Sequence, residues 1–125
     1  FMGWIDDVVL HSLYRACDVI VVPSRFEPFG LVALEAMASG CPVIVADTGG
    51  LREVVPDDQV GLRFTPGDKD ELRTLICRVL EDEPTRTQLA AQAAEHVLTF
   101  GWPDVATSVA GLYRELEPAD TPALV

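Results

Sequence analysis

The chain has 125 residues, with nine Lys and Arg against twenty Asp and Glu, so its formal net charge is −11. This charge disfavours nucleic acid and anionic membranes as partners. A hydrophobic content of 49% is enough for the core of one domain. No apolar run reaches the roughly 18 residues of a membrane-spanning helix, and no signal peptide is visible.

The cysteines indicate the redox state of the compartment in which the protein works. Cys17, Cys41 and Cys77 are odd in number, lie within apolar segments and show no metal-ligand spacing. Core thiols of a reducing compartment are therefore favoured over disulfides or a metal site. We expect a cytoplasmic protein with no bound metal.

The chain opens on a short apolar pair, Phe1 and Met2, typical of the end of a strand, and then turns at Gly3 and Trp4. Asp6 or Asp7 can cap the helix that follows. The apolar positions of this helix recur at helical spacing: Leu10, Leu13, Tyr14 and Cys17. His11 lies off this stripe, which indicates a surface residue.

Residues 18–22 form an unbroken run ending in β-branched residues, which predicts a strand buried on both faces, as in a parallel sheet. Pro23 ends that strand. After the loop 24–30, Gly30 opens an apolar helix over residues 31–39 in which Glu35 is the only charged residue. Removing a carboxylate from water costs on the order of several kcal/mol, so Glu35 should contact an arginine, backbone donors or a ligand hydroxyl.

The loop 24–30 is a candidate ligand site. In open parallel sheets, ligands bind beyond the carboxyl ends of the strands, where this loop is expected. Gly30 has no side chain to block an approach. The free N–H groups at the start of the next helix carry the positive end of its dipole, which suits a phosphate.

A second strand-loop-helix unit follows, with a strand at 43–46 and a short helix at 51–55. Its loop, with Thr48, Gly49 and Gly50, is also expected at a carboxyl end and should face the same crevice as Glu27. Two readings stay open: the two glycines line a donor or acceptor site, or they only permit a tight turn.

The remaining pattern predicts an edge strand at 61–64, a helix after Asp68, a helix after Pro84, a corner at 101–103 and a last amphipathic helix. We expect His96 to be solvated and residues 117–125 to form a disordered tail. The alternation of strands and helices predicts a doubly wound, Rossmann-like α/β parallel sheet over residues 1–116.

Several motifs together resemble a known family. Glu27 and Glu35, separated by seven residues, are framed by Pro-Ser before and by Glu-Ala-Met-Ala-Ser-Gly-Cys-Pro-Val after. Further matches are the leading Phe-x-Gly, the segment 13–18, the segment 48–55, Gly61-Leu62, the segment 66–68 and the corner 100–102. This order is similar to the paired-glutamate signature of retaining glycosyltransferases of the glycogen-synthase-like group 1, which have the two-domain GT-B fold. The resemblance runs from Phe1 to about Tyr113.

The resemblance implies roles for individual residues. Glu27 would lie beside the transferred sugar as the catalytic residue, and Glu35 would accept hydrogen bonds from the ribose of a nucleotide sugar such as UDP-glucose. The expected donor-binding residues also include Phe29, Gly30, Leu31, Ser24, Gly3 and Trp4. Arg25, Thr48, Gly49 and Gly50 are candidate lining residues of the cleft, although Arg25 can equally pair with a neighbouring carboxylate.

The resemblance also implies the reaction and what surrounds this segment. A glycosyl group would pass to an acceptor hydroxyl with retention of configuration, with no metal or other cofactor. The first strands of the donor domain, its basic diphosphate clamp and the acceptor domain would lie outside these residues, leaving an unpaired sheet edge prone to self-association. A non-catalytic nucleotide-sugar-binding or interaction module and a sugar-nucleotide epimerase of the same fold stay open as alternatives.

Overall fold

The computed structural model describes residues 1–116. The predicted tail at 117–125 lies outside the described residues. In chain order the elements are α1 (Asp7–Ala16), β1 (Ile20–Val22), α2 (Leu31–Ala38), β2 (Val43–Ala46), α3 (Leu51–Val54), β3 (Leu62–Phe64), α4 (Lys69–Glu81), α5 (Glu83–His96), the 3₁₀ helix η1 (Val97–Phe100) and α6 (Trp102–Leu116).

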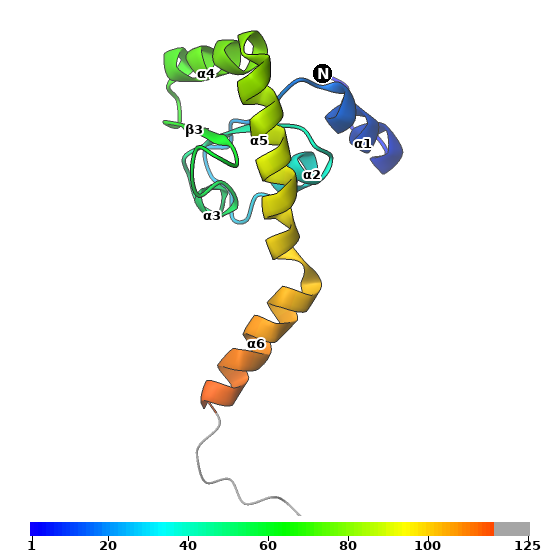
Figure 1. Cartoon of the computed structure of the whole chain (residues 1–125), viewed down its shortest axis with the longest axis vertical. Coiled ribbons are helices and arrows are strands. Elements are labelled where there is room, and N and C mark those ends of the chain that lie inside the picture. Colours follow the sequence, from blue (N-terminus) through cyan, green and yellow to red (C-terminus); the bar gives the residue numbers. More distant parts are fainter. Residues whose placement is uncertain (117–125) are drawn as a thin grey trace, which may run out of the picture.

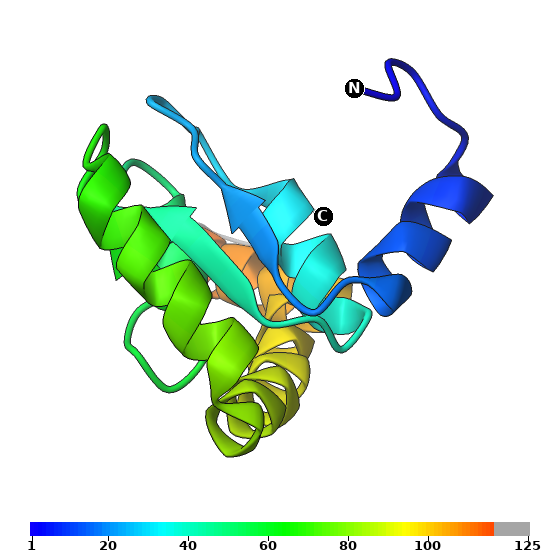
Figure 2. The same ribbon diagram turned by 90° about the horizontal axis from the view of Figure 1, so that it is seen from above.

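The three strands form a parallel sheet in the order β1-β2-β3. Val21 pairs with Ile44, and Val45 pairs with Arg63. Figure 2 shows α4 in green on one side of the sheet and α2 in cyan on the other. This arrangement confirms the predicted doubly wound, Rossmann-like α/β fold.

The central strand β2 divides the core in two, because alternate side chains of a strand point to opposite faces. Val43 and Val45 pack in a cluster with Met37 of α2 and Leu51 of α3. Ile44 and Ala46 pack on the other face, with residues of β3, α4 and α5. All four β2 residues are buried, so the strand that leads to the second candidate loop is the most enclosed element of the sheet.

Strand β1 differs from the prediction. It begins at Ile20, two residues later than expected, and of its residues only Val22 is buried. The reason is its position, because β1 pairs with β2 on one side and with no other strand among residues 1–116. β3 has the edge position that its sequence predicts, although it begins at Leu62.

Two predictions about single side chains are wrong. Cys17 and Cys77 are exposed, and of the three thiols only Cys41 lies in the core. His96 is half-buried, with Nε2 3.1 Å from the carbonyl oxygen of Val54 and its ring against Phe100. This contact between His96 and α3 arises from the packing of α5 on the sheet, and the helical periodicity of α5 does not predict it.

The last helix, α6, extends away from the rest of the molecule (Figure 1). None of its residues is buried, and its predicted apolar face, which includes Val109, Leu112 and Leu116, is exposed. Between residues 1 and 116, no helix combines the length and the apolar character needed to cross a membrane.

Candidate functional site

The loop between β1 and α2 folds around Glu27. This side chain is half-buried and turns back on its own loop. Its Oε1 accepts a hydrogen bond from the N–H of Gly30 at 3.2 Å, and its Oε2 accepts one from the hydroxyl of Ser24 at 3.4 Å. Gly30 caps α2 with φ +104°, a conformation that glycine adopts without strain. The carboxylate of Glu27 is therefore held at the start of α2.

The loop that follows β2 lies directly against this first loop. The N–H of Gly50 donates to the carbonyl oxygen of Glu27 at 2.8 Å, and the hydroxyl of Thr48 donates to the carbonyl oxygen of Arg25 at 3.3 Å. A Cβ at Gly49, where φ is +48°, would lie 2.1 Å from the Glu27 carbonyl oxygen, and one at Gly50 would lie 2.5 Å from that of Pro28. The two glycines therefore permit close contact between the loops.

The N-terminus of α2 adds hydrogen-bond donors to this edge of the sheet. Among the described residues, no acceptor pairs with the N–H groups of Leu31 and Val32 in the first turn. These groups directly follow Gly30, whose N–H donates to Glu27, and the helix dipole places partial positive charge on them. Gly30, which the resemblance implies as a donor-binding residue, donates its N–H to Oε1 of Glu27 in this structure.

Glu35 lies one turn further along α2 and is half-buried. Its Oε2 accepts a hydrogen bond from the phenol of Tyr14 at 3.1 Å. The expected partners were an arginine, backbone donors or a ligand, so Tyr14 is a contact that sequence reasoning missed. The sequence did contain a signal for this contact, because Tyr14 lies on the apolar stripe of α1 and a buried phenol needs a hydrogen-bond partner.

The basic residues near these loops are already engaged or exposed. Arg52 contacts Asp47 through Nε at 2.9 Å, and Arg63 reaches the same carboxylate at 3.6 Å. Arg25 is exposed and takes part in none of the ion pairs formed within residues 1–116. No group of three or more Cys, His, Asp or Glu within the same residues is arranged to hold a metal ion.

The other predicted residues divide between two places. Phe29 and Leu31, both partly exposed, border a largely apolar hollow of about 460 Å³ with Phe100 and Trp102. Gly3 and Trp4 lie in the N-terminal segment before α1, where Trp4 is 99% exposed. The structure therefore brings Ser24, Glu27, Gly30 and the Thr48 loop together, but it does not bring Gly3 and Trp4 to them.

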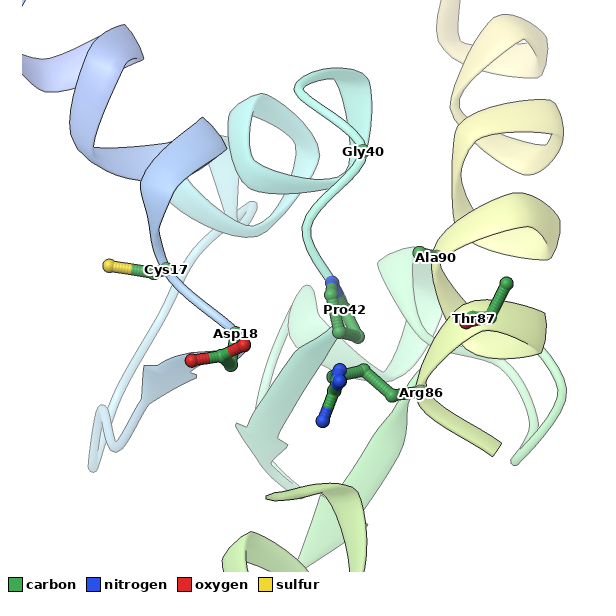
Figure 3. Close-up of a pocket in the computed structure, with 7 residues that line it drawn as sticks. All are labelled: Cys17, Asp18, Gly40, Pro42, Arg86, Thr87 and Ala90. Atoms are coloured by element: carbon green, nitrogen blue, oxygen red, sulfur yellow. The ribbon is translucent and has the colours of Figure 1, made fainter. Parts of the chain in front are cut away.

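A separate hollow of about 240 Å³ lies at the opposite end of the sheet (Figure 3). Asp18 and Pro42 precede β1 and β2, so they mark the amino ends of these strands. Arg86 points into this hollow, and its guanidinium donates to the carbonyl oxygens of Val79 and Leu80 at the end of α4. Arg86 thus has a structural role in terminating that helix.

Comparison with known proteins places this geometry in a family. The sequence profile described as "Glycosyl transferases group 1" matches residues 1–96. A glycogen synthase of Mycobacterium tuberculosis is 43% identical over 115 residues, covering 90% of this chain and 28% of the relative. The chain spans between 25% and 30% of the length of the curated relatives that it matches.

Two solved structures share the fold. A sucrose-phosphate synthase from Thermosynechococcus elongatus superposes with a TM-score of 0.81 at 43% identity, over 93% of this chain and 29% of that protein. HepE of Anabaena, in complex with UDP-glucose, superposes with a TM-score of 0.78 at 31% identity, over 93% of this chain and 32% of that protein. These neighbours are GT-B glycosyltransferases. The chain belongs to the group 1 glycosyltransferases.

Proposed function

We propose that this chain is the donor-binding part of a retaining glycosyltransferase that transfers a glycosyl group from a nucleotide sugar to an acceptor hydroxyl. One observation carries the proposal: the carboxylate of Glu27 lies beside the N-terminus of α2, at the carboxyl end of a parallel sheet. At this edge of the sheet, the helix amides can bind the diphosphate of a nucleotide sugar and the carboxylate can contact its sugar.

The proposed roles follow from the charge of each group. The amides at the start of α2 bind the diphosphate, whose negative charge complements the helix dipole. Glu27 lies by the sugar ring, where its negative charge stabilises the positive charge that develops on the anomeric carbon during transfer. Glu35 accepts hydrogen bonds from the ribose, as in the resembled family.

The donor is proposed to be UDP-glucose or a related nucleotide sugar, a choice supported by the UDP-glucose complex of HepE. We also propose that no metal and no resident cofactor takes part, and that the leaving diphosphate accepts the acceptor proton. The resemblance to the retaining group supports both points. The odd number of cysteines supports a cytoplasmic setting.

The 125 residues alone are proposed to be inactive. The relatives are more than three times longer, and this chain carries nine basic residues against twenty acidic ones. Two of those basic residues, Arg52 and Arg63, are paired with Asp47. Neutralising a diphosphate therefore requires groups outside this segment, as does binding the acceptor.

The test is a product assay on the full-length protein with UDP-glucose and then other UDP, ADP and GDP sugars. We expect acceptor-dependent release of the nucleoside diphosphate, a product with the donor's anomeric configuration by NMR, and unchanged turnover with a chelator. Inverted product, or conversion of the donor sugar without an acceptor, would contradict the proposal, and the latter would favour an epimerase. Binding without turnover would favour a binding module.

A further inference from the structure

Tyr14 is the only residue of α1 that is buried, with 4% of its surface exposed. Its ring joins the core cluster that also contains Leu34 and Met37 of α2. The phenol oxygen therefore needs a hydrogen-bond partner within the protein, and it donates to Oε2 of Glu35 at 3.1 Å. This is the one side-chain hydrogen bond between α1 and α2 in residues 1–116.

The hydrogen bond uses only half of the carboxylate. Within the described residues, Oε1 of Glu35 has no protein partner, although Tyr14 holds Oε2. Both flanking residues of Glu35 are buried or nearly so, since Leu34 is 8% exposed and Ala36 is 0% exposed. The backbone of α2 at this position is thus fixed, and the remaining freedom lies in the three torsions of the glutamate side chain.

We propose that Tyr14 is a positioning residue that fixes the rotamer of Glu35 so that Oε1 faces the ribose hydroxyls of the donor. The inference rests on the proposed function, in which Glu35 binds the ribose. Fixing the side chain before binding removes the rotamer entropy that Glu35 would otherwise lose when the donor binds. Tyr14 acts through Glu35 and does not touch the reacting atoms.

The phenol is suited to this role because it stays neutral and keeps its proton. Burial, followed by the hydrogen bond and the negative charge of Glu35, raises the pKa of Tyr14 to about 12. Tyr14 therefore remains a hydrogen-bond donor over the whole physiological pH range.

The test compares binding of UDP and 2′,3′-dideoxy-UDP to the full-length protein by calorimetry, with the ADP and GDP pairs where those bind more tightly. Tyr14→Phe keeps the ring and removes only the hydroxyl. We expect its affinity for UDP to fall about 5- to 10-fold, with the affinity for the dideoxy analogue unchanged within about twofold. In steady-state kinetics of Tyr14→Phe, the KM for the donor should rise and kcat should stay unchanged.

Two controls separate the possible results. Tyr113→Phe changes the other tyrosine of these 125 residues, which lies exposed on α6, and should leave both affinities unchanged. In a Glu35→Ala background, Tyr14→Phe should have no further effect on the preference for ribose, because no carboxylate remains to be positioned.

The outcomes also distinguish this inference from the proposed function. If Glu35→Ala leaves the preference for ribose intact, Glu35 does not bind the ribose and the proposed function loses that contact. If Glu35→Ala abolishes the preference while Tyr14→Phe retains it, the positioning role of Tyr14 is overturned and the function stands. Equal loss of both ligands in Tyr14→Phe, accompanied by a lower melting temperature, would show a structural role only and would also overturn the inference.

Discussion

The N–H of Gly50 donates to the carbonyl oxygen of Glu27 at 2.8 Å, so the loop after β2 supports the loop that carries the proposed catalytic carboxylate. Two loops that are more than twenty residues apart in the chain thereby act as one unit. Glu27 is not placed by its own loop alone, and its function should depend on the glycines that let the second loop approach.

Gly49→Ala tests this dependence. A Cβ there would lie 2.1 Å from the Glu27 carbonyl oxygen, and φ is +48°. We expect the variant to lose about 2 kcal/mol or more of stability and most of its activity, because the backbone under Glu27 must move. Urea denaturation measures the loss of stability, and product assays on the full-length protein measure the loss of activity.

The matched control is Gly111→Ala in α6, where the new Cβ would meet nothing within 4 Å apart from its chain neighbours and the backbone of its own helix. It should raise stability by roughly 0.5 to 1 kcal/mol, since alanine favours a helix interior. A Gly49→Ala protein that is as stable and active as the wild type would show that the two loops are not coupled as described.

The two glutamates should differ in kinetics. Glu27→Gln keeps the size of the side chain but removes the charge proposed to face the sugar, so kcat of the full-length protein should fall roughly 100-fold or more, about 3 kcal/mol. Glu35→Gln should mainly raise the donor KM, because ribose contacts are similar in the ground and transition states.

Steady-state kinetics with varied donor, checked by thermal melting, decides this assignment. Both variants should remain folded, since both side chains are only half-buried. Normal turnover of Glu27→Gln would remove Glu27 from the reaction. Unfolding of Glu35→Gln with unchanged donor affinity would assign Glu35 to the fold alone.

The three thiols should react in two classes. Cys17 and Cys77 are exposed, whereas Cys41 is 1% exposed. Burial, and then the charges of Cys17 and Asp18, raises the pKa of Cys41 to about 11, which leaves little thiolate at neutral pH.

A disulfide reagent should therefore modify two thiols quickly and the third only after denaturation. Cys41→Ala should leave the fast count at two, which makes it the matched control. Three fast thiols in the native protein would place Cys41 outside the core.

Alkaline titration should report on Tyr14. Its folded pKa of about 12 lies above the unfolded value of about 10. The stabilisation from the neutral phenol is therefore fully present below pH 10 and is lost as the pH rises from 10 to 12.

Tyr14→Phe should remove this part of the alkaline decline in stability, as measured by denaturation at a series of pH values. Tyrosinate absorbance of the native wild type should show a late step that the variant lacks. The same alkaline decline in both proteins would argue against the buried hydrogen bond to Glu35.

The isolated 125-residue chain should associate with itself through β1. This strand pairs with β2 alone within the described residues, and the N–H of Ile20 points to the carbonyl oxygen of Pro42. Successive N–H groups of a strand point to opposite sides, so the N–H of Val21 points away from β2, to the open edge of the sheet.

Val21→Pro removes that outward donor and should reduce association, since proline is tolerated at a sheet edge. Light scattering over a range of concentrations measures the effect, with thermal melting to check the fold. A wild-type chain that stays monomeric at high concentration would show that the open edge is harmless.

The sequence by itself determined the fold class and the edge of the sheet at which the two candidate loops lie together. Strand and helix periodicities are local features of the sequence. The β-branched run before Pro23 and the helix start at Gly30 therefore predict a parallel strand, a loop and a helix without information on the elements that pack against them. The rule that ligands bind at carboxyl ends then located Glu27 and the Thr48 loop at one edge. The family signature added the roles that remain to be tested.

Only the tertiary structure decided which groups the glutamates contact. Tyr14 and Glu35 are 21 residues apart, and their hydrogen bond exists because α1 packs on α2. The exposure of Cys17 and Cys77, the contact of His96 with Val54 and the close approach of Gly49 to Glu27 are likewise pairwise results of packing. A side-chain pattern records which face of an element is apolar, but it does not record which residue of another element that face will meet.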